Sequence, residues 1–247
     1  MKKFENIHTA YIGVLTDVRD DFDHLCAPRD KEIREIRDYM FRIEEPVAEP
    51  IITNDTKRNV VIERYTQAEC DLYDSCSNKV EDFAKASSFW NQIQNPDGTI
   101  NSAYGHLIWK NESFGNEFEG VMRTPWAWAK ESLIADKDTR QAFIKFSLPE
   151  HHWFGNKDQT CTMHGNFLIR EDALNLTIIM RSNDVVLGLA YDLPWFISLI
   201  DRMLEELKPT YPELKKGSYT HLSHSMHMYE KDIKKINKMI GDADTDQ

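Results

Sequence analysis

The spacing of apolar residues predicts several helices in the first half of the chain. In residues 30–40 (DKEIREIRDYM), Ile, Ile and Tyr recur at every third position, as they do on one face of a helix. Two prolines interrupt residues 40–52, so that segment is expected to be extended. Apolar positions within residues 60–83 predict a pair of helices with an acidic outer face. Residues 95–99 (NPDGT) predict a turn, and residues 118–134 predict another helix.

Predicted strands are concentrated in the second half, in segments rich in Phe, Ile, Leu and Thr. They are residues 142–148, 163–170, 174–180 and 219–229. The polar pair Glu171–Asp172 separates two of them and predicts a hairpin. Residues 186–207 are apolar and end before a Lys-Pro pair, so they predict a long buried central helix, and residues 231–240 predict a final helix. The pattern predicts a single α+β domain with a mixed sheet, flanking helices and that central helix.

Composition and charge narrow the class of protein. The chain has 247 residues and a formal net charge of −11, from 30 Lys and Arg against 41 Asp and Glu. The negative field disfavours binding to nucleic acid or to an anionic membrane, so a small anionic ligand would need its own cluster of arginines. No apolar stretch is long enough to span a membrane, and the start lacks the apolar core of a signal peptide. The four cysteines form no CxxC pair, which is typical of reduced thiols, and a cytoplasmic location is expected.

Two polar segments are the candidates for chemistry. Cys161 lies in DQTCTMHG at the head of a predicted strand, where a lone cysteine is more often an inert small side chain than a nucleophile. The following strand ends in MRSND, residues 180–184, which combines a cation, a hydroxyl, an amide and a carboxylate. Gly188 and Asp192 come next, at the start of the predicted central helix. Taken alone, this second segment fits a polar turn with a helix cap equally well.

Together and in this order, the two segments resemble the thymidylate synthase superfamily. The second motif of that family usually reads QRSxDxxLGxPxN, and residues 180–192 read MRSNDVVLGLAYD. Further segments match the family in the same order along most of the chain. They are PRD (28–30), YMFRIEEP (39–46), Ala68–Glu69, Trp90, NSAYG (101–105), DTR (138–140), Cys161 and HMY (227–229). The resemblance implies the α+β fold of that family.

One departure from the family pattern bears on the base of the substrate. The family ends its second motif with Asn, whose amide pairs with uracil, whereas this chain has Asp192. Cytosine presents an amino donor and a ring-nitrogen acceptor, and a carboxyl group can accept from that amino group. The deoxycytidylate hydroxymethylase branch of the family carries the same change. Thr160, Thr162 and Met180 also fit that branch, whereas Gln141 replaces the second arginine of the family's phosphate clamp.

The resemblance also implies a role for each candidate residue. The thiolate of Cys161 would add to C6 of the pyrimidine, Glu69 would manage protons near N3, and Asp192 would pair with the base. The expected substrate-binding residues are Arg181, Ser182, Arg140, Arg29, His227 and Tyr229. The expected folate-binding residues are Trp90, Tyr104, Asp184 and Gly188. Each position has an ordinary structural alternative, such as core packing for the aromatic residues and a helix cap for Asp184.

The activity implied by the resemblance is transfer of a one-carbon unit from 5,10-methylenetetrahydrofolate to C5 of dCMP. Water would add to give the 5-hydroxymethyl product, and no metal is expected. Arg140 would reach the phosphate bound by a second copy, so a homodimer with shared active sites is expected. The alternatives within the family are a dCMP methyltransferase and a thymidylate synthase acting on dUMP. Outside it are a non-catalytic nucleotide-binding module and a metal-dependent hydrolase built on His221, His224 and His227.

Overall fold

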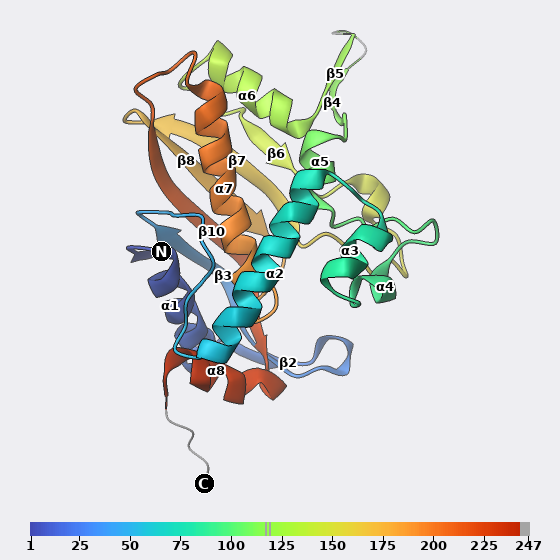
Figure 1. Ribbon diagram of the computed structural model, residues 1–247, viewed down its shortest axis with the longest axis vertical. Helices are drawn as coiled ribbons and strands as arrows, with labels where there is room; N and C mark the ends of the chain where they lie inside the picture. Colours follow the sequence, from blue (N-terminus) through green and yellow to red (C-terminus); the bar gives the residue numbers. More distant parts are fainter. Residues whose placement is uncertain (117, 119, 243–247) are drawn as a thin grey trace. The chain divides into compact units, whose positions relative to one another are not determined.

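The computed structural model of the protein describes residues 1–116, 118 and 120–242 (Figure 1). The chain divides into two compact units. The first unit comprises residues 1–67, 179–199 and the chain from 217 onward, and the second unit comprises residues 68–178 and 200–216. Each unit contains both helices and strands, which confirms the predicted α+β class.

The first unit is built on a mixed sheet. Its strands are β1 (Lys2–Phe4), β2 (His24–Cys26), β3 (Ile33–Ile43), β9 (Asn183–Asp184) and most of β10 (Lys215–Tyr229). β3 pairs in parallel with β1 and antiparallel with β2 and β10, while β9 pairs in parallel with β10. Its helices are α1 (Ile7–Asp20), the start of α2 (Thr56–Ser75), the start of α7 (Leu189–Leu207) and α8 (Ile233–Ile240), with short 3-10 turns at Pro28–Asp30 and Glu230–Asp232.

Helix α1, which the sequence pattern did not predict, packs against β3 and forms the core of the first unit. Asn6 caps it, because its side-chain oxygen accepts hydrogen bonds from the backbone of His8 and Thr9. The face of α1 that carries Tyr11 and Val14 is fully buried. The N-terminal segment is therefore part of the folded core.

The helix predicted over residues 30–40 is wrong, because β3 occupies that segment. Tyr39, Phe41 and Ile43 are buried at alternate positions, which is the period of a strand. The helical spacing depended on counting Ile36 as a core residue together with Ile33 and Tyr39, but Ile36 is only half-buried in the structure. Pairing of β3 with three other strands overrides the local spacing, and strands occur in the first half of the chain as well as the second.

The second unit combines a small sheet with several short helices. Its strands are β4 (Phe114–Asn116), β5 (Val121–Arg123), β6 (Phe143–Lys145), β7 (Thr162–Arg170) and most of β8 (Ala173–Met180). β7 lies between β6 and β8, and β4 pairs with β5. Its helices are the remainder of α2 and of α7, α3 (Val80–Ala86), α4 (Trp90–Ile93), α5 (Tyr104–Trp109) and α6 (Pro125–Ala135), with a 3-10 turn at Pro149–His151.

Most other predicted elements are confirmed. The helix pair over residues 60–83 corresponds to α2 and α3, the central helix to α7, and the final helix to α8. The hairpin joins β7 to β8, with Glu171 and Asp172 at φ 52° and 56°, the left-handed conformation of a tight turn. The helix predicted over 118–134 begins later, at Pro125, because Thr124 caps it and the preceding residues form β5. Among the helices of the described residues, none has both the length and the apolar character needed to cross a membrane.

Candidate active site

In the first unit, the segment that follows β8 forms a tight turn beside β10. Strand β9 places Asn183 opposite Met226 and Asp184 opposite His227. Asp184 then closes the turn, since its Oδ1 accepts from the backbone of Val186 at 2.8 Å and of Leu187 at 3.2 Å. Its own carbonyl accepts from the Gly188 backbone at 2.9 Å, and α7 begins at the next residue. The Asp184 side chain therefore stabilises the turn that precedes α7, and it does not cap the helix itself.

A hydrogen bond between Asn183 and Asp192 crosses this turn. Asn183 Nδ2 donates to Asp192 Oδ2 at 2.7 Å. Gly188 stands beside the bond, and a Cβ there would lie 3.1 Å from the amide nitrogen and 3.3 Å from the carboxylate oxygen. Burial raises the pKa of Asp192 to about 6, although the bond from Asn183 lowers it and the charge of Asp184 raises it. Burial also raises the pKa of Asp184.

The guanidinium of Arg58, at the start of α2, stabilises the turn through two hydrogen bonds. Arg58 donates to the Val186 carbonyl at 2.7 Å and to the Tyr191 hydroxyl at 2.8 Å. On β10, the Tyr219 hydroxyl lies 2.9 Å from Nδ1 of His221, whose ring stacks on Phe41. Burial lowers the pKa of His221 to about 3, so this histidine is neutral at physiological pH. Arg58 thus holds the turn and Tyr219 lies near Asp192, and the sequence pattern assigned neither residue to the site.

His227 and Tyr229 follow on β10, next to the same turn. His227 is buried, and its Nδ1 lies 3.2 Å from the Ser225 carbonyl oxygen. Its ring meets that of Tyr229 edge to face at 5.7 Å, and Lys231 Nζ lies 5.2 Å from the Tyr229 ring centroid. The first unit therefore brings His227 together with Asp184, as β9 pairs with β10 at these two residues.

Three predicted substrate-binding residues also lie in the first unit. Arg181 is exposed and Ser182 is half-buried, directly before β9. Arg29 is exposed in the turn between β2 and β3, with φ 53°, and Asp30 follows with φ 59°. Two consecutive residues in the left-handed region form a tight turn here, as Glu171 and Asp172 do in the β7–β8 hairpin. Both arginine side chains are thus at the surface of the first unit.

In the second unit, Cys161 is half-buried immediately before β7. The next residue, Thr162, is fully buried and donates from its hydroxyl to the Tyr104 hydroxyl at 2.9 Å. Tyr104 stacks on Tyr73 of α2, with ring centroids 5.2 Å apart. Glu69 is buried one helical turn before Tyr73, on the same face of α2. The Tyr104 hydroxyl therefore meets the first residue of β7, and Glu69 shares a face of α2 with Tyr73, which stacks on Tyr104.

Asp158 anchors the loop that precedes Cys161. Its Oδ2 accepts from the Ser102 backbone at 2.9 Å, and its Oδ1 accepts from the Ser102 hydroxyl. Asn101 Nδ2 donates to the Asp158 carbonyl at 3.1 Å. The NSAYG segment therefore positions the cysteine loop as well as Tyr104. Asp158 carries no sequence signal of its own, since its partner lies far away in the chain.

Trp90 belongs to the same aromatic cluster of the second unit. It meets Phe83 at 4.9 Å, Phe83 meets Tyr73 at 6.3 Å, and Tyr73 stacks on Tyr104. Trp90 is buried, and its Nε1 has no hydrogen-bond partner among the described residues. Arg140 lies apart, exposed after α6, and makes no side-chain hydrogen bond or ion pair within the part of the chain that the structure describes.

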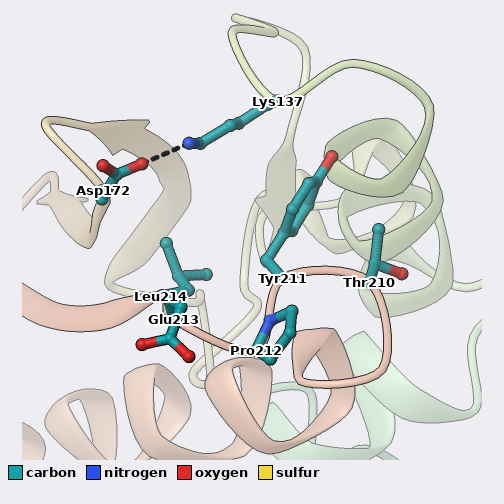
Figure 2. Close-up of a pocket in the computed structure, with 7 residues that line it drawn as sticks. All are labelled: Lys137, Asp172, Thr210, Tyr211, Pro212, Glu213 and Leu214. Carbon is teal, nitrogen blue, oxygen red and sulfur yellow. Dashed lines mark hydrogen bonds and ion pairs between the residues drawn. The ribbon is translucent and has the colours of Figure 1, made fainter.

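A cavity of about 200 Å³ in the second unit contains none of the predicted site residues (Figure 2). It is lined by Lys137, Asp172, Thr210, Tyr211, Pro212, Glu213 and Leu214. Lys137 pairs with Asp172 across it, and the Tyr211 hydroxyl donates to the Leu133 carbonyl at 2.8 Å. Lys137 and Asp172 are thus paired with each other, and the Tyr211 hydroxyl is bound to a backbone carbonyl outside the lining. Within the described residues, no three His, Cys, Asp or Glu side chains group as metal ligands would.

Comparison with known proteins identifies the class to which this arrangement belongs. The sequence profile of the thymidylate synthase family matches residues 30–246, and the chain belongs to that family. The thermostable thymidylate synthase A of Bacillus subtilis shares the fold, with a TM-score of 0.70 at 16% identity over 96% of this chain and 84% of that one. The family resemblance read from the sequence is confirmed.

Two phage enzymes are similar to the chain at the level of sequence. The deoxycytidylate 5-hydroxymethyltransferase of Enterobacteria phage T6 is 28% identical over 176 residues, which cover 68% of each protein. The deoxyuridylate hydroxymethyltransferase of Bacillus phage SP01 is 27% identical over 223 residues, 89% of this chain and 56% of that protein. These relationships support a folate-dependent one-carbon transferase, since the family uses methylenetetrahydrofolate as co-substrate.

Proposed function

We propose that the protein transfers a one-carbon unit to C5 of dCMP and forms 5-hydroxymethyl-dCMP. The observation that carries this proposal is Asp192, a carboxyl group at the base-pairing position of the family motif. Its Oδ2 accepts from Asn183, whereas its Oδ1 has no side-chain hydrogen bond among the described residues. That oxygen has the chemistry to accept from the exocyclic amino group of cytosine. The T6 relative, named for deoxycytidylate, supports the same base.

The side chains of the site divide the chemistry between them. The thiolate of Cys161 forms the bond to C6, and the electron pair of the C5–C6 double bond moves to C5, which becomes nucleophilic. Methylenetetrahydrofolate supplies the one-carbon unit at the oxidation level of formaldehyde. Glu69 moves protons at N3 and the amino group. C5 attacks the one-carbon unit, and loss of the C5 proton then expels tetrahydrofolate and leaves an exocyclic methylene group on C5. Water adds to that methylene carbon and supplies the hydroxyl group, and departure of the sulfur from C6 restores the C5–C6 double bond.

The described residues fit the folate co-substrate. The buried indole of Trp90 has an unpartnered Nε1, and Asp184 uses Oδ1 within its turn while Oδ2 makes no side-chain hydrogen bond among the described residues. A pterin ring offers a flat apolar face and N–H donors, which suit an aromatic ring and a carboxylate oxygen. The family resemblance assigns Trp90, Tyr104 and Asp184 to this ring. Gly188 would act indirectly, through the shape of the turn.

A dUMP hydroxymethyltransferase is the second candidate. The SP01 relative with that activity in its name matches 89% of the chain, against 68% for the T6 relative. Uracil, however, presents O4, an acceptor, where cytosine presents a donor. An ionised Asp192 would set two acceptors against each other, which is unfavourable in a buried site. The carboxylate therefore favours dCMP.

Mass spectrometry of the product tests this function directly. The purified protein is incubated with methylenetetrahydrofolate and either dCMP or dUMP, with the Cys161→Ser variant as the blank. We expect dCMP to gain CH2O. A gain of CH2 would identify a methyltransferase, and turnover of dUMP without turnover of dCMP would overturn the assignment of the base.

A further inference from the structure

Asn183 and Asp192 form a hydrogen-bonded side-chain pair, and the family motif assigns no role to Asn183. Asn183 is only 3% exposed, and its single side-chain hydrogen bond among the described residues is the 2.7 Å bond from Nδ2 to Asp192. Its Oδ1 is buried without a partner in that part of the chain. A buried amide with one unpaired polar atom is unfavourable for folding, so a purely stabilising role does not account for it.

The backbone around this pair encloses the hydrogen bond. Asn183 is fixed in β9 opposite Met226, and Asp192 lies in the first turn of α7, where its backbone donates to the Gly188 carbonyl at 3.0 Å. Gly188 leaves just enough room for the bond, since a Cβ there would meet both of its polar atoms. The orientation of the carboxylate is thus set by the turn and by Asn183 together.

The donor and acceptor positions of cytosine explain why a fixed orientation of the Asp192 carboxylate would matter. A carboxylate that faced the base with both oxygens would match the amino group with one and oppose the lone pair of N3 with the other. We propose that Asn183 is a positioning residue for base selection, which holds Oδ2 so that an ionised Asp192 meets the base through Oδ1 alone. This inference rests on the proposed function, because it takes Asp192 as the group that contacts the base.

The protonation of Asp192 links this geometry to pH. Burial and the charge of Asp184 raise its pKa, the bond from Asn183 lowers it, and the neighbouring Tyr219 is uncharged because burial raises its pKa as well. A protonated carboxyl group offers one donor and one acceptor, as an amide does, and would accept uracil. Loss of the Asn183 donor would therefore extend the protonated, unselective form to higher pH.

Nucleotide binding without folate tests the proposal. Calorimetry measures the affinities of the Cys161→Ser protein for dCMP and for dUMP from pH 5 to 8. Adding Asn183→Leu should lower the dCMP-to-dUMP affinity ratio roughly tenfold at pH 7 and raise the pH at which the ratio is half-lost by about one unit. Adding Asp192→Asn should remove the preference, and Asn183→Leu should then have no further effect on the ratio.

Control variants distinguish a role of Asn183 in orienting Asp192 from a general effect on the stability of the fold. Asn175→Leu removes a different half-buried amide, on β8, whose Nδ2 donates to the Ala173 carbonyl at 3.0 Å, and it should leave the ratio unchanged. If Asn183→Leu does not fold, Asn183→Asp keeps the shape and cannot donate when ionised. It should shift the pH midpoint in the same direction and further, because its charge also raises the pKa of Asp192. Equal weakening of both nucleotides without a change in the pH midpoint would overturn the role of Asn183. An unchanged ratio in Asp192→Asn would overturn the proposed base selection itself, and the role of Asn183 with it.

Discussion

Replacing Gly188 with alanine tests how closely the turn between β9 and α7 is packed. The added Cβ would lie 3.0 Å from the Asp184 carbonyl oxygen, 3.1 Å from Asn183 Nδ2 and 3.3 Å from Asp192 Oδ2. All three distances are shorter than ordinary van der Waals contact for carbon. The backbone oxygen cannot swing away as the end of a long side chain could. The turn must therefore open by a few tenths of an ångström, and the hydrogen bond between the two side chains is strained.

The expected loss of stability in Gly188→Ala follows from these contacts. Inserting a methyl group into a closely packed site costs about 1–3 kcal/mol. Restricting the unfolded chain by Gly→Ala returns about 0.4–1 kcal/mol. The free energy of unfolding should therefore fall by about 1–2 kcal/mol, which corresponds to a drop in Tm of roughly 2–8 °C for a chain of this size. The preference for dCMP should fall as well, because Asp192 loses its fixed orientation.

Two measurements check this prediction for Gly188→Ala. Urea unfolding followed by circular dichroism gives the change in stability, and kcat/KM for dCMP and dUMP gives the change in base preference. In an Asp192→Ala background, part of the crowding is removed, so Gly188→Ala should cost less stability there. An unchanged Tm together with an unchanged base preference would show that the turn accepts the methyl group and would refute the packing argument.

The remaining predictions concern the chemistry. Wild-type protein should favour dCMP over dUMP in kcat/KM by roughly ten- to a hundredfold, and Asp192→Asn should weaken or reverse that preference. The preference should decline as the pH falls through about 6, because Asp192 becomes protonated. Steady-state rates from pH 5 to 8 check this, and a dCMP-to-dUMP ratio of kcat/KM that does not change with pH would contradict it. Cys161→Ser should abolish turnover while dCMP affinity stays within about tenfold, whereas Cys70→Ser should remain active. Inactive Arg140→Ala and Cys161→Ala chains should regain activity on subunit exchange, and failure despite demonstrated exchange would exclude a shared site.

The sequence by itself determined most elements of the second half and the family. The β7–β8 hairpin and the α7 helix each carry their own pattern of apolar residues, so local spacing is enough to find them. The order of short motifs along the chain was enough to indicate the family. Asp192 was recognised as a departure because it replaces an Asn, which has a different hydrogen-bonding capacity. Roles for Cys161 and Glu69 remain predictions of that resemblance.

Only the tertiary structure decided which side chains meet. β3 is a strand because β10, β1 and β2 pair with it, and two of these partners, β10 and β1, lie far from it in the sequence. Arg58 reaches the Val186 carbonyl across more than a hundred residues of chain, and nothing around Arg58 in the sequence signals that contact. Asn183 stands inside the recognised motif, yet its bond to Asp192 exists only because the turn at Gly188 folds one over the other. Local spacing records which face of an element is apolar, whereas the partner of a buried polar group depends on how distant segments pack, and that is a property of the whole fold.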